Sequence, residues 1–128
     1  MRGRPPKVET STSPRIWLDA DGAPAAAVEA ACRYAHEARV MLTLVASRPQ
    51  TCPNSAFVRS VVLAPGNEVV SGRIAGVLAK GDVVVTGDKT LVSTAGEKKA
   101  TALDPHKGIA LAGLLEETLG KKRVAVAP

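Results

Sequence analysis

The chain has 128 residues, about the length of one domain, and 45% of them are hydrophobic, which is enough to fill a core. No uncharged apolar run approaches the roughly 18 residues of a membrane-spanning helix, and no apolar stretch follows the basic N-terminus before Pro14. The net charge of +5 belongs mostly to the ends, since residues 1–15 carry +3, residues 116–128 carry +1 and residues 16–115 carry only +1. The composition predicts a soluble cytoplasmic protein that has no contact with a membrane and whose body is nearly neutral.

Strands and helices are predicted to alternate along the chain. In chain order the predicted elements are a strand at 15–18, a helix at 24–38, strands at 40–46 and 57–64, a helix at 69–80, a strand at 83–86, a helix at 91–98, a strand at 100–103 and a helix at 109–119. Pro24 fits the first position of its helix, and the continuous apolar run at 40–46 is typical of a strand covered on both faces. This alternation predicts an α/β domain at 15–120 with a mainly parallel sheet, preceded by a flexible basic arm at 1–14 and followed by a basic tail at 121–128.

Acidic residues follow two of the predicted strands. Asp19 and Asp21 come directly after the first strand, and Asp88 follows the strand at 83–86. Carboxyl ends of parallel strands share one edge of the sheet, and carboxylates that meet there repel one another unless a cation or protons offset their charge. Mg²⁺ and Mn²⁺ are bound by such oxygen ligands, whereas the alternative is that these residues only form turns. Asp82 opens its strand, about 20 Å from Asp88 by strand rise, and is predicted to be a capping or solvated residue.

Four segments together resemble the YaiI/YqxD family of uncharacterised bacterial proteins. They read IWLDADGAP, LVAS, GDVVVTGDKTL and ALDPHKG, and the resemblance covers about residues 15–108. It implies a PIN-like fold, a three-layer α/β/α sandwich of the kind found in metal-dependent ribonucleases, in which acids at the strand ends hold one or two divalent ions. The expected activity is hydrolysis of nucleic-acid phosphodiesters, with RNA favoured over DNA and with Mg²⁺ or Mn²⁺ as the cofactor.

The resemblance also implies which residues form the site. Asp19 and Asp21 match the family's DAD motif, and Asp88 matches the acid after the TxD strand, so these three are the expected catalytic residues and metal ligands. Glu29 falls where the first helix of the family commonly carries an acid. Glu68 retains the first acid of a DxAD-like element, and both glutamates are expected to support the metal.

Ser71 departs from the family pattern. It replaces the second acid of the DxAD-like element, and a neutral hydroxyl is a poor substitute for a charged ligand of Mg²⁺. An alternative therefore stays open, in which the domain is catalytically degenerate and binds nucleic acid or a protein partner without cleaving. A further alternative is a phosphatase similar to the haloacid dehalogenases. It is less favoured, because Val92 stands where that class usually has a second aspartate.

Several basic residues are candidate contacts for nucleic acid. Arg2 and Arg4 belong to an Arg-Gly-Arg-Pro run that resembles the core of an AT-hook, which lies in the minor groove of A·T-rich DNA. Arg48, His106 and Lys107 follow predicted strands and could contact phosphate, although for each of them the favoured interpretation is an ordinary surface residue.

Overall fold

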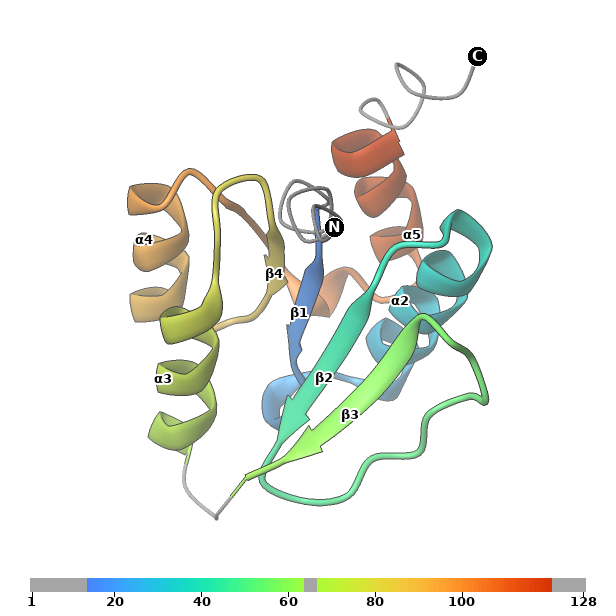
Figure 1. The fold of residues 1–128 in the computed structure, drawn as a ribbon, viewed down its shortest axis with the longest axis horizontal. Helices are drawn as coiled ribbons and strands as arrows, with labels where there is room; N and C mark the ends of the chain where they lie inside the picture. Colours follow the sequence, from blue (N-terminus) through green and yellow to red (C-terminus); the bar gives the residue numbers. More distant parts are fainter. Residues whose placement is uncertain (1–13, 64–66, 121–128) are drawn as a thin grey trace, which may run out of the picture.

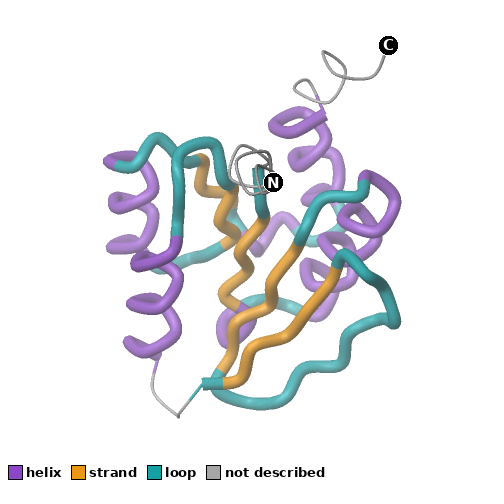
Figure 2. Tube along the Cα trace, in the orientation of Figure 1, coloured by secondary structure: helices purple, strands orange, loops and turns teal. Residues whose placement is uncertain are grey.

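A five-stranded parallel sheet lies between two layers of helices (Figure 1, Figure 2). The computed structural model describes residues 14–63 and 67–120. The strands, in chain order, are β1 (Ile16–Asp19), β2 (Leu42–Ala46), β3 (Val58–Val62), β4 (Val83–Val85) and β5 (Thr101–Leu103). They lie side by side in the order β3-β2-β1-β4-β5. The predicted three-layer α/β/α architecture is confirmed.

Helices cover both faces of the sheet, two on each side (Figure 1). They are α2 (Ala25–Ala38), α3 (Asn67–Val77), α4 (Lys89–Glu97) and α5 (Ala110–Leu115). Helices α2 and α5 pack on one face around an apolar cluster that includes Leu18, Leu44 and Leu111, whereas α3 and α4 pack on the other face around Ile74 and Leu91. All five residues of β2 are buried, as expected for a strand with helices on both faces.

The predicted elements are confirmed in kind and order, with differences at their ends. Pro24 precedes α2 as its N-cap residue, with an extended backbone, so the prediction that it occupies the first helical position was wrong. The last predicted helix is α-helical only to Leu115 and continues as a π-helix over Glu116–Gly120. Strand β3 pairs only with β2 and is largely exposed, because it forms an edge of the sheet.

Asp82 is buried inside the fold, with only 2% of its surface exposed, so the prediction that it is solvated was wrong. Its carboxylate accepts hydrogen bonds from the backbone N–H of Arg15 (3.1 Å), the indole N–H of Trp17 (3.1 Å) and the backbone N–H of Ala79 (3.0 Å), besides an ion pair with the guanidinium of Arg15 at 3.3 Å. The carboxylate instead joins the segment that follows α3 to the start of β1.

The order of the strands creates a switch point between β1 and β4. The chain leaves β1 for β2 on one side and later returns to β4 on the other side. In open parallel sheets the two loops that diverge from such a point leave a crevice at the carboxyl ends of the strands, where ligands bind. The carboxyl ends of β1 and β4 are therefore the place in this fold where a site is expected.

Some predicted features fall outside this description. Residues 1–13 of the predicted arm and the predicted tail at 121–128 lie outside the described residues. Over the described ranges, none of the helices combines the length and the apolar character that crossing a membrane requires.

Candidate functional site

Three aspartates lie at the switch point. Asp19 is the last residue of β1, Asp21 follows in the short 3₁₀ turn η1 (Ala20–Gly22), and Asp88 is the N-cap residue of α4, just after β4. Their charges act on one another, because Asp21 and Asp88 both contribute to raising the pKa of Asp19. Parallel strand pairing thus brings together carboxylates that are 67 to 69 positions apart in the sequence.

Asp19 is half-buried at the end of β1. Loss of hydration raises its pKa above the usual 3.8, and the nearby charges of Asp21 and Asp88 raise it further. The hydroxyl of Thr86 opposes this shift by donating a hydrogen bond to Asp19 Oδ2 at 3.2 Å. Ionised Asp19 is therefore held in an environment that disfavours its negative charge.

Asp21 is held by the loop that follows β2. Its Oδ1 accepts a hydrogen bond from the backbone N–H of Ser47 at 2.9 Å. Its Oδ2 is buried and accepts no hydrogen bond from any residue within 14–63 and 67–120. A buried carboxylate oxygen without a donor is costly, which makes this atom a candidate ligand for a cation.

Asp88 is fixed by three donors. Its Oδ1 accepts from the backbone N–H groups of Thr90 (2.8 Å) and Leu91 (3.2 Å) at the start of α4, and its Oδ2 accepts from the hydroxyl of Ser71 at 2.8 Å. The Ser71 hydrogen bond is the main cause that lowers the pKa of Asp88, and the two backbone donors add to it. The carboxylate is thus kept ionised by the protein itself and is turned toward α3 and α4.

Thr86 connects the acids but is absent from the candidates that the sequence suggests. Its side chain is 2% exposed; its hydroxyl donates to Asp19 and accepts from the backbone N–H of Asp88 at 3.0 Å. The signal in the sequence is the Thr-Gly-Asp spacing after three valines, which places a hydroxyl at the carboxyl end of a strand beside the next acid. The contact with Ser47 could not be predicted in this way, because it uses a backbone N–H.

Of the two other expected metal ligands, only Glu29 has a side chain within the described part of the chain. Glu29 is exposed on α2, where its charge acts on Cys32; burial, then Cys52 and then Glu29 raise the pKa of that thiol to about 11. The side chain of Glu68 lies outside the described part of the chain. The structure therefore associates Glu29 with a thiol of the α2 face rather than with the carboxylates at the switch point.

The predicted nucleic-acid contacts divide into two groups. Arg48, His106 and Lys107 are exposed in loops that follow β2 and β5, at the same edge of the sheet as the aspartates. Arg2 and Arg4 lie outside the described residues. Arg48 and Lys107 thus add two exposed positive charges at this edge.

The carboxylates at the switch point do not form a site in which three protein side chains hold a metal, but they fit a site in which one or two carboxylates do so. Across the described ranges, no three side chains of His, Cys, Asp or Glu converge on a point where they could hold a metal. Mg²⁺, however, is commonly bound by one or two carboxylates, with waters and substrate phosphates completing its shell. Asp19, disfavoured as a bare anion, and Asp21, with a free buried oxygen, fit that second kind of site.

Replacing Asp19 by asparagine is expected to stabilise the free protein at pH 7 by on the order of 1 kcal/mol. The pKa of Asp19 is raised in the folded state, so the stability it contributes is fully present below the pKa of the unfolded carboxyl and is lost as the pH rises through the folded pKa. Asparagine cannot ionise and can still accept the hydrogen bond from Thr86. Urea unfolding of both proteins between pH 3.5 and 8, in a metal-free buffer, tests this: the advantage of the variant should shrink toward the acid end, and a constant difference would contradict it.

Comparison with known proteins places the chain in a group without an assigned activity. A family model described as uncharacterised, YaiI/YqxD, matches residues 17–111. A UPF0178 protein of Halorhodospira halophila is 44% identical over 92 residues, which are 72% of this chain and 61% of the relative. UPF0178 proteins of Alkalilimnicola ehrlichii and Desulfotalea psychrophila are each 40% identical over 71% and 72% of this chain, and 62% of each relative. The chain thus matches about three fifths of the length of these relatives, and no solved structure matches it.

Proposed function

The chain belongs to the uncharacterised YaiI/YqxD family, and belonging to this family does not assign a reaction. From the geometry of the site, we propose that the protein is a divalent-metal-dependent nuclease of the PIN-like kind. The substrate is a phosphodiester of RNA or DNA, with RNA the expected one. The observation that carries the proposal is the buried Oδ2 of Asp21, which lacks a hydrogen-bond donor within the described residues and lies beside a carboxylate with a raised pKa.

Each aspartate has a distinct part in this proposal. Asp19 and Asp21 would hold Mg²⁺ or Mn²⁺, and Asp88 adds negative charge close to them while its own oxygens stay bonded to Ser71 and the start of α4. A bound divalent ion would supply an activated water and offset the charge that develops on the phosphate. The protein would contribute fixed orientation, because Thr86 holds Asp19 and the N–H of Ser47 holds Asp21.

Cleavage of single-stranded RNA and DNA in the presence of Mg²⁺ or Mn²⁺ is the direct test. We expect cleavage that EDTA abolishes and that Asp19→Asn and Asp21→Asn each lower by at least roughly 100-fold, since even outer partners of a metal ligand affect activity by 10- to 100-fold. Glu97→Gln is a matched control, because Glu97 is an exposed acid at the far end of α4. Cleavage of equal rate in all four proteins would indicate a contaminant, and its complete absence, with no rise of melting temperature on adding metal, would refute the proposal.

The hydrogen bond between Ser71 and Asp88 favours a second candidate, a domain that binds nucleic acid without cleaving it. At 2.8 Å the Ser71 hydroxyl satisfies Asp88 Oδ2 without a cation. If this is the function, the same preparations should retain RNA by a salt-dependent interaction, with or without EDTA, while leaving it intact. Filter binding in parallel with the cleavage assay separates the two candidates.

A further inference from the structure

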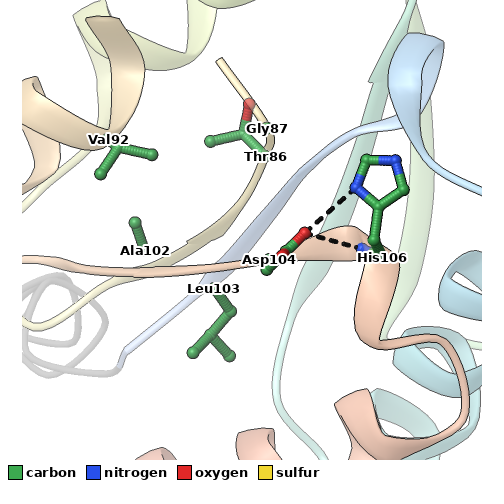
Figure 3. A pocket seen from close by; sticks show the side chains of 7 residues that line it. All are labelled: Thr86, Gly87, Val92, Ala102, Leu103, Asp104 and His106. Atoms are coloured by element: carbon green, nitrogen blue, oxygen red, sulfur yellow. Dashed lines mark hydrogen bonds and ion pairs between the residues drawn. The ribbon is translucent and has the colours of Figure 1, made fainter. Parts of the chain in front are cut away.

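A pocket of about 420 Å³ opens at the carboxyl ends of β4 and β5, and its lining includes Thr86, which contacts Asp19 (Figure 3). Its volume falls in the range of small-molecule sites. One wall is apolar and is formed by the side chains of Val92 on α4 and Ala102 on β5, which lie near each other in Figure 3. The pocket therefore offers a flat organic ring a surface on which to lie.

The opposite rim is polar and is formed by Asp104 and His106 (Figure 3). Asp104 Oδ1 accepts hydrogen bonds from the backbone N–H of His106 at 2.8 Å and lies 3.2 Å from its ring Nδ1. Both contacts use the same oxygen, so the acceptor capacity of Oδ2 is left for a ligand. The two contacts from His106 are the main causes that lower the pKa of Asp104, so the group is an ionised carboxylate that only accepts hydrogen bonds at neutral pH.

Thr86 is shared between the pocket and the acidic site. It lines the pocket, and its hydroxyl donates to Asp19 Oδ2 at 3.2 Å. Gly87, the next residue, lines the pocket without a side chain, and a Cβ there would lie 3.9 Å from His106 Cε1. Thr86 thus contacts both the pocket and Asp19, so a nucleotide whose base lies in the pocket would extend toward the acidic site.

We propose that this pocket binds a guanine base of the nucleic-acid substrate and that Asp104 is the residue that selects it. The inference rests on the proposed function, since it assigns the base next to the phosphate that the aspartates would receive. Guanine presents two adjacent donors on one edge, N1–H and the 2-amino group, and both can donate to the one oxygen left for a ligand, Asp104 Oδ2, which has two lone pairs. Uracil presents a single N–H between two carbonyl oxygens, which an acceptor-only group repels, and adenine presents one amino group beside a ring acceptor.

Binding of single nucleotides in EDTA tests the assignment without any metal chemistry. We expect guanosine 5′-monophosphate to bind at least roughly tenfold more tightly than uridine 5′-monophosphate, the discrimination typical of a good two-point contact to a base. Inosine 5′-monophosphate, which lacks only the 2-amino group, should fall between them. In an NMR titration the amide signals of Gly87, Ala102 and His106 should shift together.

Asp104→Asn is the matched variant. Asparagine caps the following turn as aspartate does, so the loop should keep its conformation, but it replaces one acceptor by donors. The preference for guanosine over uridine monophosphate should disappear or reverse, which loss of structure alone would not cause. Equal affinities for the two nucleotides in the wild type, binding that shifts amides elsewhere, or no binding at millimolar concentrations would each overturn the proposal.

The result is separable from the outcome of the nuclease assay. If guanosine monophosphate binds in the pocket but no nucleic acid is cleaved, the base site stands and the nuclease proposal fails. If RNA is cleaved with no dependence on base and no effect of Asp104→Asn, the nuclease proposal stands and the base site is wrong.

Discussion

Replacing Asp82 by alanine is expected to lower the free energy of unfolding by about 3–5 kcal/mol, because it leaves three partly buried donors without an acceptor, at about 1–3 kcal/mol each. The change leaves the backbone N–H groups of Arg15 and Ala79 and the indole N–H of Trp17 without their acceptor in the interior. For a domain whose total stability is about 5–15 kcal/mol, such a loss removes a substantial part of the total. Equilibrium urea unfolding followed by Trp17 fluorescence measures it.

Two milder variants define the cause. Arg15→Ala removes a side chain that is 41% exposed and leaves Asp82 its three other donors, so it should cost only about 1 kcal/mol. Asp82→Asn keeps the size of the side chain and one acceptor, and it should fall between Arg15→Ala and Asp82→Ala. A loss below about 1 kcal/mol for Asp82→Ala would contradict the role of this carboxylate as the link between β1 and the end of α3.

Replacing Ser71 by aspartate is expected to make the protein depend on divalent cations for its stability. The variant exchanges a hydroxyl that donates to Asp88 at 2.8 Å for a second carboxylate facing the first. In EDTA, the lost hydrogen bond and the new repulsion should together lower the free energy of unfolding by about 1–3 kcal/mol. Adding Mg²⁺ at millimolar concentration should restore much of this loss, because a ligand that binds only the folded state stabilises it by mass action.

Ser71→Asn is the control for this variant. It also removes the hydroxyl, but its amide can still donate to Asp88 and it adds no charge. Its melting temperature should respond to Mg²⁺ as that of the wild type does. If Ser71→Asp shows no larger response than Ser71→Asn, the two carboxylates do not converge on a common cation. In that case position 71 is not one at which a carboxylate creates a metal site.

Most of the candidate functional residues lie at one edge of the sheet. Asp19, Asp21 and Asp88, together with the pocket beside Thr86, all lie beyond the carboxyl ends of the strands. The charge distribution of the sequence agrees with this arrangement, because the body of the chain is nearly neutral overall and still concentrates acids at this edge. Such a concentration of like charge is unfavourable for the free protein, as the raised pKa of Asp19 indicates.

The strands were well predicted because their local signals are strong. The apolar run that contains β2 and the valines of β4 have a composition that favours strands, and both lie within two residues of their predicted limits. The ends of helices were harder to predict. Pro24 fixes an extended residue before α2 rather than its first turn, and the helix after Ile109 changes to a π-helix, because its last turns depend on packing that the local sequence does not contain.

The sequence by itself determined the alternation of strands and helices and, with it, the edge at which Asp19, Asp21 and Asp88 meet. These follow from hydrophobic periodicity and from the rule that parallel strands share one carboxyl edge. The tertiary structure alone decided the partners of two acids: Asp82 became a buried acceptor for β1, and Asp88 became the acceptor of the Ser71 hydroxyl. The physical reason is that burial and hydrogen bonding depend on neighbours that are distant in the sequence. The distances between such residues cannot be obtained from the order of residues along the chain.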